Sequence, residues 1–136
     1  MKIAKGKWAG LQAVSNQHGV IAAVAIDQRN ALRTLLAKAK GTDPEAIPRE
    51  MLEQFKEAVS RTLTPHASAI LLDPEYGLPA ARQRAKNTGL LLAYERTGYD
   101  KAVPGRLPRL LDHWSVRRLA GAGADCIKVL LYYSPS

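Results

Sequence analysis

The stretch ASAILLDPEYGLP, residues 67–79, runs from apolar side chains into a polar turn and then into a proline. A short apolar run bounded by turn residues is typical of a strand buried in a parallel sheet. Pro79 suits the first turn of a helix, because its fixed backbone angle is helical and its missing N–H is not needed there. The stretch therefore predicts a strand over 67–72 and a helix over 80–87.

The same order of strand and helix is predicted along the rest of the chain. Further strands are predicted over 20–26, 90–94 and 126–131, and further helices over 5–15, 32–41, 48–63 and 114–120. In the helix that starts near Pro48, four apolar residues fall four apart and are predicted to form its buried face: Met51, Phe55, Val59 and Leu63. Alternating strands and helices favour an α/β fold with a parallel sheet covered by helices.

Two architectures are built from such units, an open doubly wound sheet and a (βα)8 barrel of roughly 250 residues. The glycine-rich fingerprint of dinucleotide-binding sheets is missing after the first strand, where Ile26-Asp27-Gln28-Arg29 stands instead. Four strand–helix units in 136 residues are what about half of a barrel occupies. We therefore expect residues 1–136 to form one partial domain, the N-terminal half of a TIM barrel, with a leading helix at about 5–15.

The composition is that of a folded chain with a basic surface. With 46% hydrophobic residues the chain can build a core, and 20 Lys and Arg against 12 Asp and Glu leave a net charge of +8. A basic balance suits nucleic acid, an anionic small substrate, or solubility alone. Because the cations are scattered rather than gathered with aromatic side chains, we expect no nucleic-acid partner.

Cysteine usage and apolar runs predict the compartment. The one cysteine, Cys126, rules out an intramolecular disulfide and is predicted to be a buried apolar residue of the last strand. The basic N-terminus never reaches the apolar core of a secretory signal, and no run approaches the roughly 18 residues of a membrane span. We therefore expect a cytoplasmic protein without a membrane partner.

Charged residues stand where the predicted strands end. Asp27, Asp73 and Glu95 follow the first three strands, and Lys128 lies within the fourth. In βα architectures the carboxyl ends of the strands carry the chemistry, so this pattern predicts a functional site. For Asp73 and Glu95 ordinary loop polarity explains the pattern equally well, and Asp27 also suits a helix N-cap.

Lys128 interrupts an otherwise apolar strand, on the same face as Cys126 and Leu130. A lysine turned toward a barrel interior loses solvent, which favours the neutral amine, a nucleophile or acid/base group, unless an anion keeps it charged. The alternative is a lysine that extends along the strand to reach water. The sequence leaves these alternatives open.

Two loops offer groups for a polar ligand. Asp27, Gln28 and Arg29 supply a carboxylate, an amide and a guanidinium, a set that suits a polyhydroxylated or phosphorylated molecule. A later loop carries four cations that suit either phosphate or solvent: Arg96, Lys101, Arg106 and Arg109.

The sequence offers no residues at the spacing of a metal site or a hydrolase triad. The three histidines, which have no ligand partner at such spacing, are His18, His66 and His113. No Gly-x-Ser-x-Gly turn is present. We therefore expect neither a metal nor triad hydrolysis.

Five blocks spread over the chain share the pattern of one enzyme family. They are GVIAAVAIDQR (19–29), ILLDPEYGLP (70–79), GLLLAYERTGY (89–99), PGRLP (104–108) and GADCIKVLLYY (123–133). Together they resemble the tagatose 1,6-bisphosphate aldolase family. The resemblance covers essentially the whole chain, and the block LDPEYG is specific.

That resemblance implies a (βα)8 barrel and a class I aldolase of the tagatose 6-phosphate pathway of lactose and galactose catabolism, with no metal or other cofactor. Such an enzyme cleaves tagatose 1,6-bisphosphate to dihydroxyacetone phosphate and glyceraldehyde 3-phosphate through a lysine Schiff base. Asp27 and Gln28 match the family's substrate-contacting pair, and Lys128 matches its active-site lysine on the fourth strand. The expected catalytic residues are Lys128 and Asp27, and the expected substrate-binding residues are Asp27, Gln28, Arg29, Asp73 and Glu95.

The chains of that family are much longer than this one. The resemblance places the Schiff-base lysine and the catalytic glutamate in the missing C-terminal half, so we expect this chain to be inactive alone. A half-barrel also leaves strand edges and an apolar inner face uncovered, which promotes self-pairing. The expected partner is a phosphorylated sugar, and a homo-oligomer is left open. The alternative functions are an aldolase for a related sugar such as a sulfofructose phosphate and a non-catalytic half-barrel used for binding or assembly.

Overall fold

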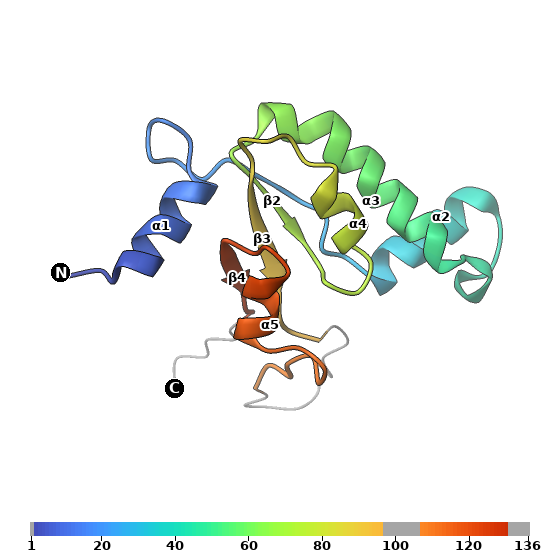
Figure 1. The fold of residues 1–136 in the computed structure, drawn as a ribbon. Helices are drawn as coiled ribbons and strands as arrows, with labels where there is room; N and C mark the ends of the chain where they lie inside the picture. Colours follow the sequence, from blue (N-terminus) through green and yellow to red (C-terminus); the bar gives the residue numbers. More distant parts are fainter. Residues whose placement is uncertain (1, 97–106, 131–136) are drawn as a thin grey trace, which may run out of the picture.

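The computed structural model describes residues 2–96 and 107–130, which contain a parallel sheet and the helices that connect its strands (Figure 1). The helices are α1 (Lys5–Val14), α2 (Asn30–Lys40), α3 (Arg49–Leu63), α4 (Leu78–Arg82) and α5 (Val116–Gly121). The strands are β1 (Ala23–Ala25), β2 (Ala69–Leu72), β3 (Gly89–Ala93) and β4 (Cys126–Lys128), and two short 3₁₀ segments lie at Pro44–Ala46 and Thr64–His66.

The four strands form one sheet in the order β1-β2-β3-β4, and every neighbouring pair is parallel. This arrangement confirms the predicted α/β fold. Three of the predicted strands were longer than those observed, because only part of each apolar run pairs with a neighbour, whereas the strand predicted over 90–94 forms one residue earlier, as Gly89–Ala93. The last of them was predicted to reach Leu131, which lies outside the described residues.

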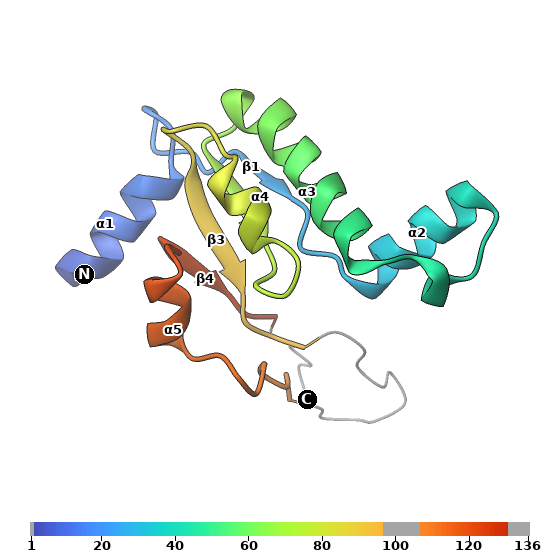
Figure 2. The ribbon, with the colours of Figure 1, turned by 45° about the vertical axis from the view of Figure 1, so that its right-hand side comes forward.

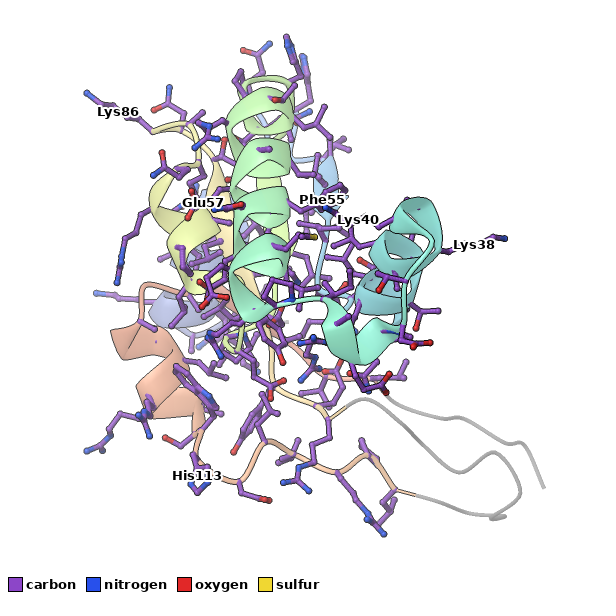
Figure 3. All side chains as sticks on the ribbon, turned by 90° about the vertical axis from the view of Figure 1, so that its right-hand side faces the viewer. Lys38, Lys40, Phe55, Glu57, Lys86 and His113 are labelled. Atoms are coloured by element: carbon purple, nitrogen blue, oxygen red, sulfur yellow. The ribbon has the colours of Figure 1, made fainter. Side chains whose placement is uncertain are left out.

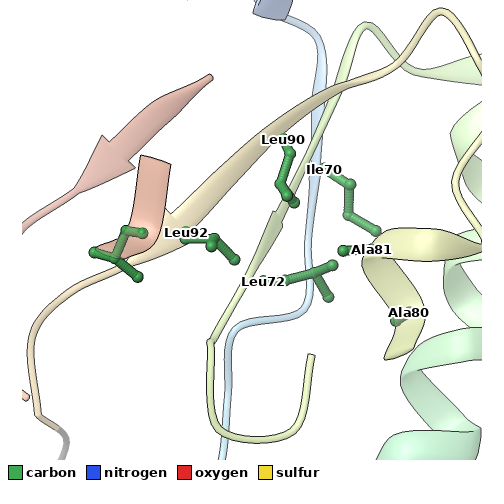
Figure 4. Packing of buried hydrophobic residues seen from close by; sticks show 7 residues of the cluster. Ile70, Leu72, Ala80, Ala81, Leu90 and Leu92 are labelled. Carbon is green, nitrogen blue, oxygen red and sulfur yellow. The ribbon is translucent and has the colours of Figure 1, made fainter. Parts of the chain in front are cut away.

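The core lies between the sheet and the helices that follow β2 and β3 in the chain. Ile70, Leu72, Leu90 and Leu92 have no exposed surface and point toward α4 and α5, where Ala80, Ala81 and Leu119 meet them (Figure 4). Small residues on α4 let this helix approach β2 closely. In Figure 2, α3 runs beside α4 and extends the helical layer toward α2.

The opposite face of the sheet is only partly covered. Ala25, Leu71, Leu91 and Cys126 stand in register across the four strands on that face. The prediction that Cys126 is buried is wrong, because its side chain lies in an edge strand with part of its surface exposed. Its partial burial, and then the nearby Asp125, raise the pKa of its thiol.

The buried face of α3 differs from the predicted one. Leu52, Lys56 and Ser60 form the fully buried stripe, whereas Phe55 and Leu63 are 37% and 43% exposed. Phe55 is labelled on α3 in Figure 3. The helix turns its polar stripe inward because Ser60 donates a hydrogen bond to the carbonyl of Ala80, and Lys56 finds acceptors at the strand ends. Hydrogen bonding thus decides the orientation over the apolar spacing.

The helix ends follow local signals. Gly41 ends α2 in the left-handed region with φ of +65°, as its position after the apolar repeat predicts. The predicted helix 114–120 begins later, at Val116, because the Ser115 side chain accepts a hydrogen bond from the amide of Arg118 and so caps it. The predicted helix 80–87 is shorter, and α4 ends at Arg82.

Helix α1 lies across the starts of β3 and β4, where Gly89 lets its backbone approach. An added Cβ at Gly89 would lie 2.3 Å from the carbonyl oxygen of Ala13. We expect Gly89→Ala to lower the free energy of unfolding by about 1–3 kcal/mol, because the helix must move away. Gly6→Ala, in the same helix with nothing within 4 Å, is the control and is expected to be neutral or slightly stabilising. Urea unfolding of both variants checks this, and equal stabilities would contradict it.

Candidate functional site

The parallel order of the strands places their carboxyl ends at one edge of the sheet, and three of the four predicted charged side chains meet there. Nζ of Lys128 lies 3.0 Å from Oδ2 of Asp27 and also donates a hydrogen bond to Oε1 of Glu95. Lys128 pairs with Ala93 in the ladder, so Glu95, two residues further along, projects toward the same side. The structure thus brings Asp27, Glu95 and Lys128 into one cluster.

The cluster also reports the shape of the sheet. Asp27 follows β1 and Lys128 ends β4, and β2 and β3 lie between these two edge strands. Neighbouring strands lie about 4.8 Å apart, so a flat sheet would hold β1 and β4 about 14 Å apart. The 3.0 Å contact between the two side chains therefore fits a sheet that curves around the cluster, as the wall of a barrel does.

The environment of Lys128 keeps its amine charged. Partial burial by itself lowers the pKa of Lys128, but the hydrogen bonds to Glu95 and Asp27 outweigh it, and the pKa is raised above its ordinary value. The exposed fractions of the three side chains are 32% for Lys128, 16% for Asp27 and 5% for Glu95. Of the alternatives that the sequence left open, the structure favours a lysine that anions hold as an ammonium ion.

Arg29 is a buried residue that contacts the backbone of the cluster at Glu95. It is 4% exposed, pairs with the carboxylate of Glu75 and donates a 2.7 Å hydrogen bond to the backbone carbonyl of Glu95. Nε of Arg29 and Oε2 of Glu95 are buried atoms without a hydrogen-bond partner among the described residues. With two of its nitrogens bound inside the protein, Arg29 holds the loops after β1, β2 and β3 together.

Asp73 is placed differently from the other predicted site residues. It has no exposed surface, and it forms an ion pair with Lys56, a residue of α3 that is itself fully buried. Its second oxygen accepts hydrogen bonds from the amides of Glu75 and Tyr76 at 3.0 and 2.7 Å. Both carboxylate oxygens are therefore used within the protein, and direct contact with a substrate does not fit this burial.

Lys56, the partner of Asp73, is a buried residue of this region that sequence reasoning did not single out. It lies on the polar side of an amphipathic helix, where lysines are ordinarily exposed, and no spacing distinguishes it from its neighbours. Burial lowers the pKa of Lys56, although Asp73 acts in the opposite direction. Three acceptors surround its nitrogen, the Asp73 carboxylate and the carbonyls of Ile26 and Gln28, which is the number an ammonium group can satisfy.

The remaining predicted groups lie around the cluster. Gln28 is exposed and follows Asp27 directly. Arg96 forms an exposed ion pair with Asp112, and Arg109 is exposed. The other two cations of that loop, Lys101 and Arg106, lie outside the described residues.

A pocket of about 470 Å³ opens beside the cluster, with walls formed by Arg29, Tyr76, Arg96 and Trp114. Asp27 and Lys128 do not line it, so the pocket adjoins the charged cluster rather than containing it. Exposed cations elsewhere point in different directions, as Lys38 and Lys86 do in Figure 3. Among the side chains that the structure describes, the basic charge is thus not gathered on one helical face.

Two further observations bear on ligand classes. Within residues 2–96 and 107–130, no group of three or more His, Cys, Asp or Glu side chains is arranged to hold a metal ion. In the same part of the chain no helix has the length and apolar content that crossing a membrane requires. The expected cytoplasmic location stays a prediction.

Comparison with known proteins adds a family to this geometry. Residues 21–136 match the family described as DeoC/LacD family aldolase. The chain is 56% identical over 133 residues to tagatose 1,6-diphosphate aldolase 2 of Enterococcus faecalis, which covers 98% of this chain and 39% of that protein. It is 50% identical over 135 residues to tagatose 1,6-diphosphate aldolase of Listeria monocytogenes, and the match covers 99% of this chain and 39% of that protein. Tagatose 1,6-diphosphate aldolase 2 of Streptococcus mutans is 51% identical over 133 residues, and the match covers 98% of this chain and 40% of that protein.

The chain thus spans about two fifths of the length of these curated relatives. The family match includes β1 to β4 and with them Asp27, Glu95 and Lys128. Over most of its length, and across the whole charged cluster, the chain belongs to the DeoC/LacD family of aldolases.

Proposed function

We propose that this chain forms the sugar-binding strand ends of an aldolase that cleaves tagatose 1,6-bisphosphate, within a single domain of the (βα)8 barrel type. The observation that carries the proposal is the cluster of Asp27, Glu95 and Lys128 at the carboxyl ends of parallel strands. In such folds the substrate binds at that end. The names of the relatives, which are tagatose 1,6-diphosphate aldolases, support the choice of sugar.

Lys128 serves this site as a charged hydrogen-bond donor. An ammonium group carries three protons, and the contacts with Asp27 and Glu95 use two of them. Among the described residues nothing accepts the third, which we assign to an oxygen of the sugar. Because a nucleophilic amine must be neutral and the pKa of Lys128 is raised, we assign to Lys128 the stabilisation of negative charge rather than covalent attack.

Asp27 and Gln28 complete the polar surface for the ligand. The Asp27 carboxylate accepts hydrogen bonds from sugar hydroxyls, and the exposed Gln28 amide both donates and accepts. In the cleavage, the catalytic glutamate that the resemblance places beyond this chain takes the proton of the C4 hydroxyl, and C4 becomes the carbonyl carbon of the released aldehyde. The C3–C4 bond breaks, and its electron pair moves toward the former carbonyl carbon, C2. The family resemblance implies that a Schiff-base lysine beyond this chain receives those electrons. Arg29 and Asp73 hold the loops that carry these groups.

A chimera tests the proposed function. Residues 1–136 are joined to the remaining part of the Enterococcus faecalis relative, and release of dihydroxyacetone phosphate from tagatose 1,6-bisphosphate is measured by a coupled assay. The relative is chosen because 56% of the residues in the region to be replaced are already identical. We expect the chimera to cleave the sugar. A chimera that folds like its parent but fails to cleave it would overturn the proposal.

The isolated chain offers a second prediction. Dihydroxyacetone phosphate and borohydride trap a lysine Schiff base as a stable adduct, which mass spectrometry locates. We expect no adduct on Lys128, because its amine is protonated and bound to two carboxylates. The folded chimera is the positive control and should be labelled outside residues 1–136. An adduct on Lys128 would show that we have assigned the wrong role to it.

A further inference from the structure

Lys56 occupies an unusual position for a lysine. It lies in the middle of α3, on the helical side of the sheet, and has no exposed surface. Its nitrogen donates 2.8 Å hydrogen bonds to the backbone carbonyls of Ile26 and Gln28 and a third to the carboxylate of Asp73. A buried ammonium is expensive unless every proton is bound, and here every proton is bound.

The two carbonyls stand on either side of Asp27. The β1 ladder has its last paired residue at Ala25, and the amide of Ile26 makes one further bond to the carbonyl of Leu71. Beyond that point the chain pairs with no other described strand, yet the Asp27 carboxylate must face Lys128 across the curved sheet. Where the β1 ladder ends, the two hydrogen bonds from Lys56 hold the backbone instead.

Asp73 connects Lys56 to the backbone of Glu95, the residue that carries the other carboxylate of the cluster. Its oxygens accept from Lys56 and from the amides of Glu75 and Tyr76, which shapes the loop after β2. Glu75 pairs with Arg29, and Arg29 in turn donates to the backbone of Glu95. These contacts therefore connect Lys56 to the backbone on either side of Asp27 and, through Asp73, Glu75 and Arg29, to the backbone of Glu95.

We propose that Lys56 is a positioning residue, whose ammonium clamps the carbonyls flanking Asp27, with Asp73 as its anchor, and so aims the Asp27 carboxylate at Lys128. Lys56 does not touch the ligand. Its importance for the aldolase reaction rests on the function proposed above, whereas its effect on Lys128 is a property of this chain without substrate. The proposed function and the positioning role of Lys56 can therefore fail independently. An inactive chimera would contradict the function but would not change the effect of Lys56 on Lys128.

The test measures how Lys128 reacts with an acetylating reagent between pH 8 and 12. Peptide mass spectrometry gives the midpoint of acetylation for each lysine of the intact 136-residue chain, with the exposed Lys86 as internal reference. In Lys56→Met/Asp73→Asn, which removes both buried charges, we expect the Lys128 midpoint to fall by about one pH unit, because Asp27 no longer faces it. Lys38→Met, the same change at an exposed position of α2, is the control and should leave the midpoint unchanged.

The conservative variant separates positioning from simple structural support. Lys56→Arg keeps a charged donor group, so we expect a Lys128 midpoint closer to that of the natural chain than in the double variant. Circular dichroism and the cooperativity of melting report whether each variant folds. A folded double variant with an unchanged Lys128 midpoint would overturn the proposal. So would the failure of both variants to fold, because Lys56 would then support the whole domain rather than the Asp27 segment.

Discussion

Lys128→Met in the chimera is expected to lower the rate of tagatose 1,6-bisphosphate cleavage by about 100-fold or more. Removing one fixed group that stabilises developing negative charge typically costs this much in turnover. The substitution also leaves Asp27 and Glu95 as neighbouring carboxylates without their shared cation. Their uncompensated negative charge repels an anionic bisphosphate, so substrate affinity should fall as well.

Steady-state kinetics of the chimera separates these effects. A loss in kcat shows that Lys128 acts on the reacting atoms, whereas a rise in KM alone shows that it only binds the sugar. The matched control is Lys86→Met, the same chemical change at an exposed position after α4. Lys86→Met should keep full activity. Equal activity of both variants would contradict the role assigned to Lys128.

Lys56→Met in the isolated chain is expected to lower the free energy of unfolding by about 3–5 kcal/mol. Asp73 has no exposed surface, so removing its partner leaves a buried carboxylate without a counter-charge. The carbonyls of Ile26 and Gln28 lose their donor as well. The total free energy of unfolding of a domain of this size is typically only about 5–15 kcal/mol, so the variant should be close to unfolding.

Urea unfolding measures this loss, and the double variant tests its cause. Lys56→Met/Asp73→Asn removes the stranded charge, so it should regain part of the stability lost in Lys56→Met. Lys38→Met at the surface should change stability by less than about 0.5 kcal/mol. A cost below about 1 kcal/mol for Lys56→Met would mean that the buried pair contributes no more than an exposed ion pair.

Much of the fold was predictable from local signals. The apolar runs bounded by Gly, Pro and Asp marked all four strands, and Gly41 and Pro48 marked helix ends, because backbone conformation at such residues depends on near neighbours. The inward face of α3 was not predictable. Phe55 and Leu63 follow the apolar spacing, but the helix is oriented by acceptors that come from β1 and β2.

The candidate site was likewise predictable only in part. That Asp27, Glu95 and Lys128 belong to one end of the sheet follows from their places in the sequence, since parallel strands share a carboxyl edge. Asp73 obeyed the same rule but turned inward to Lys56, 17 residues earlier in the chain. No sequence pattern predicts this ion pair, because it depends on how α3 packs on the strand ends.

By itself, the sequence determined the kind of element at each point, the parallel order and the edge of the sheet where charge gathers, because short-range preference and topology suffice for these. Tertiary structure alone decided the protonation of Lys128 and the burial of Lys56. Both depend on which carboxylates lie within about 3 Å, a distance set by the curvature of the sheet and the packing of α3. Electrostatic interactions depend on such distances, and residues far apart in the chain meet only when it folds.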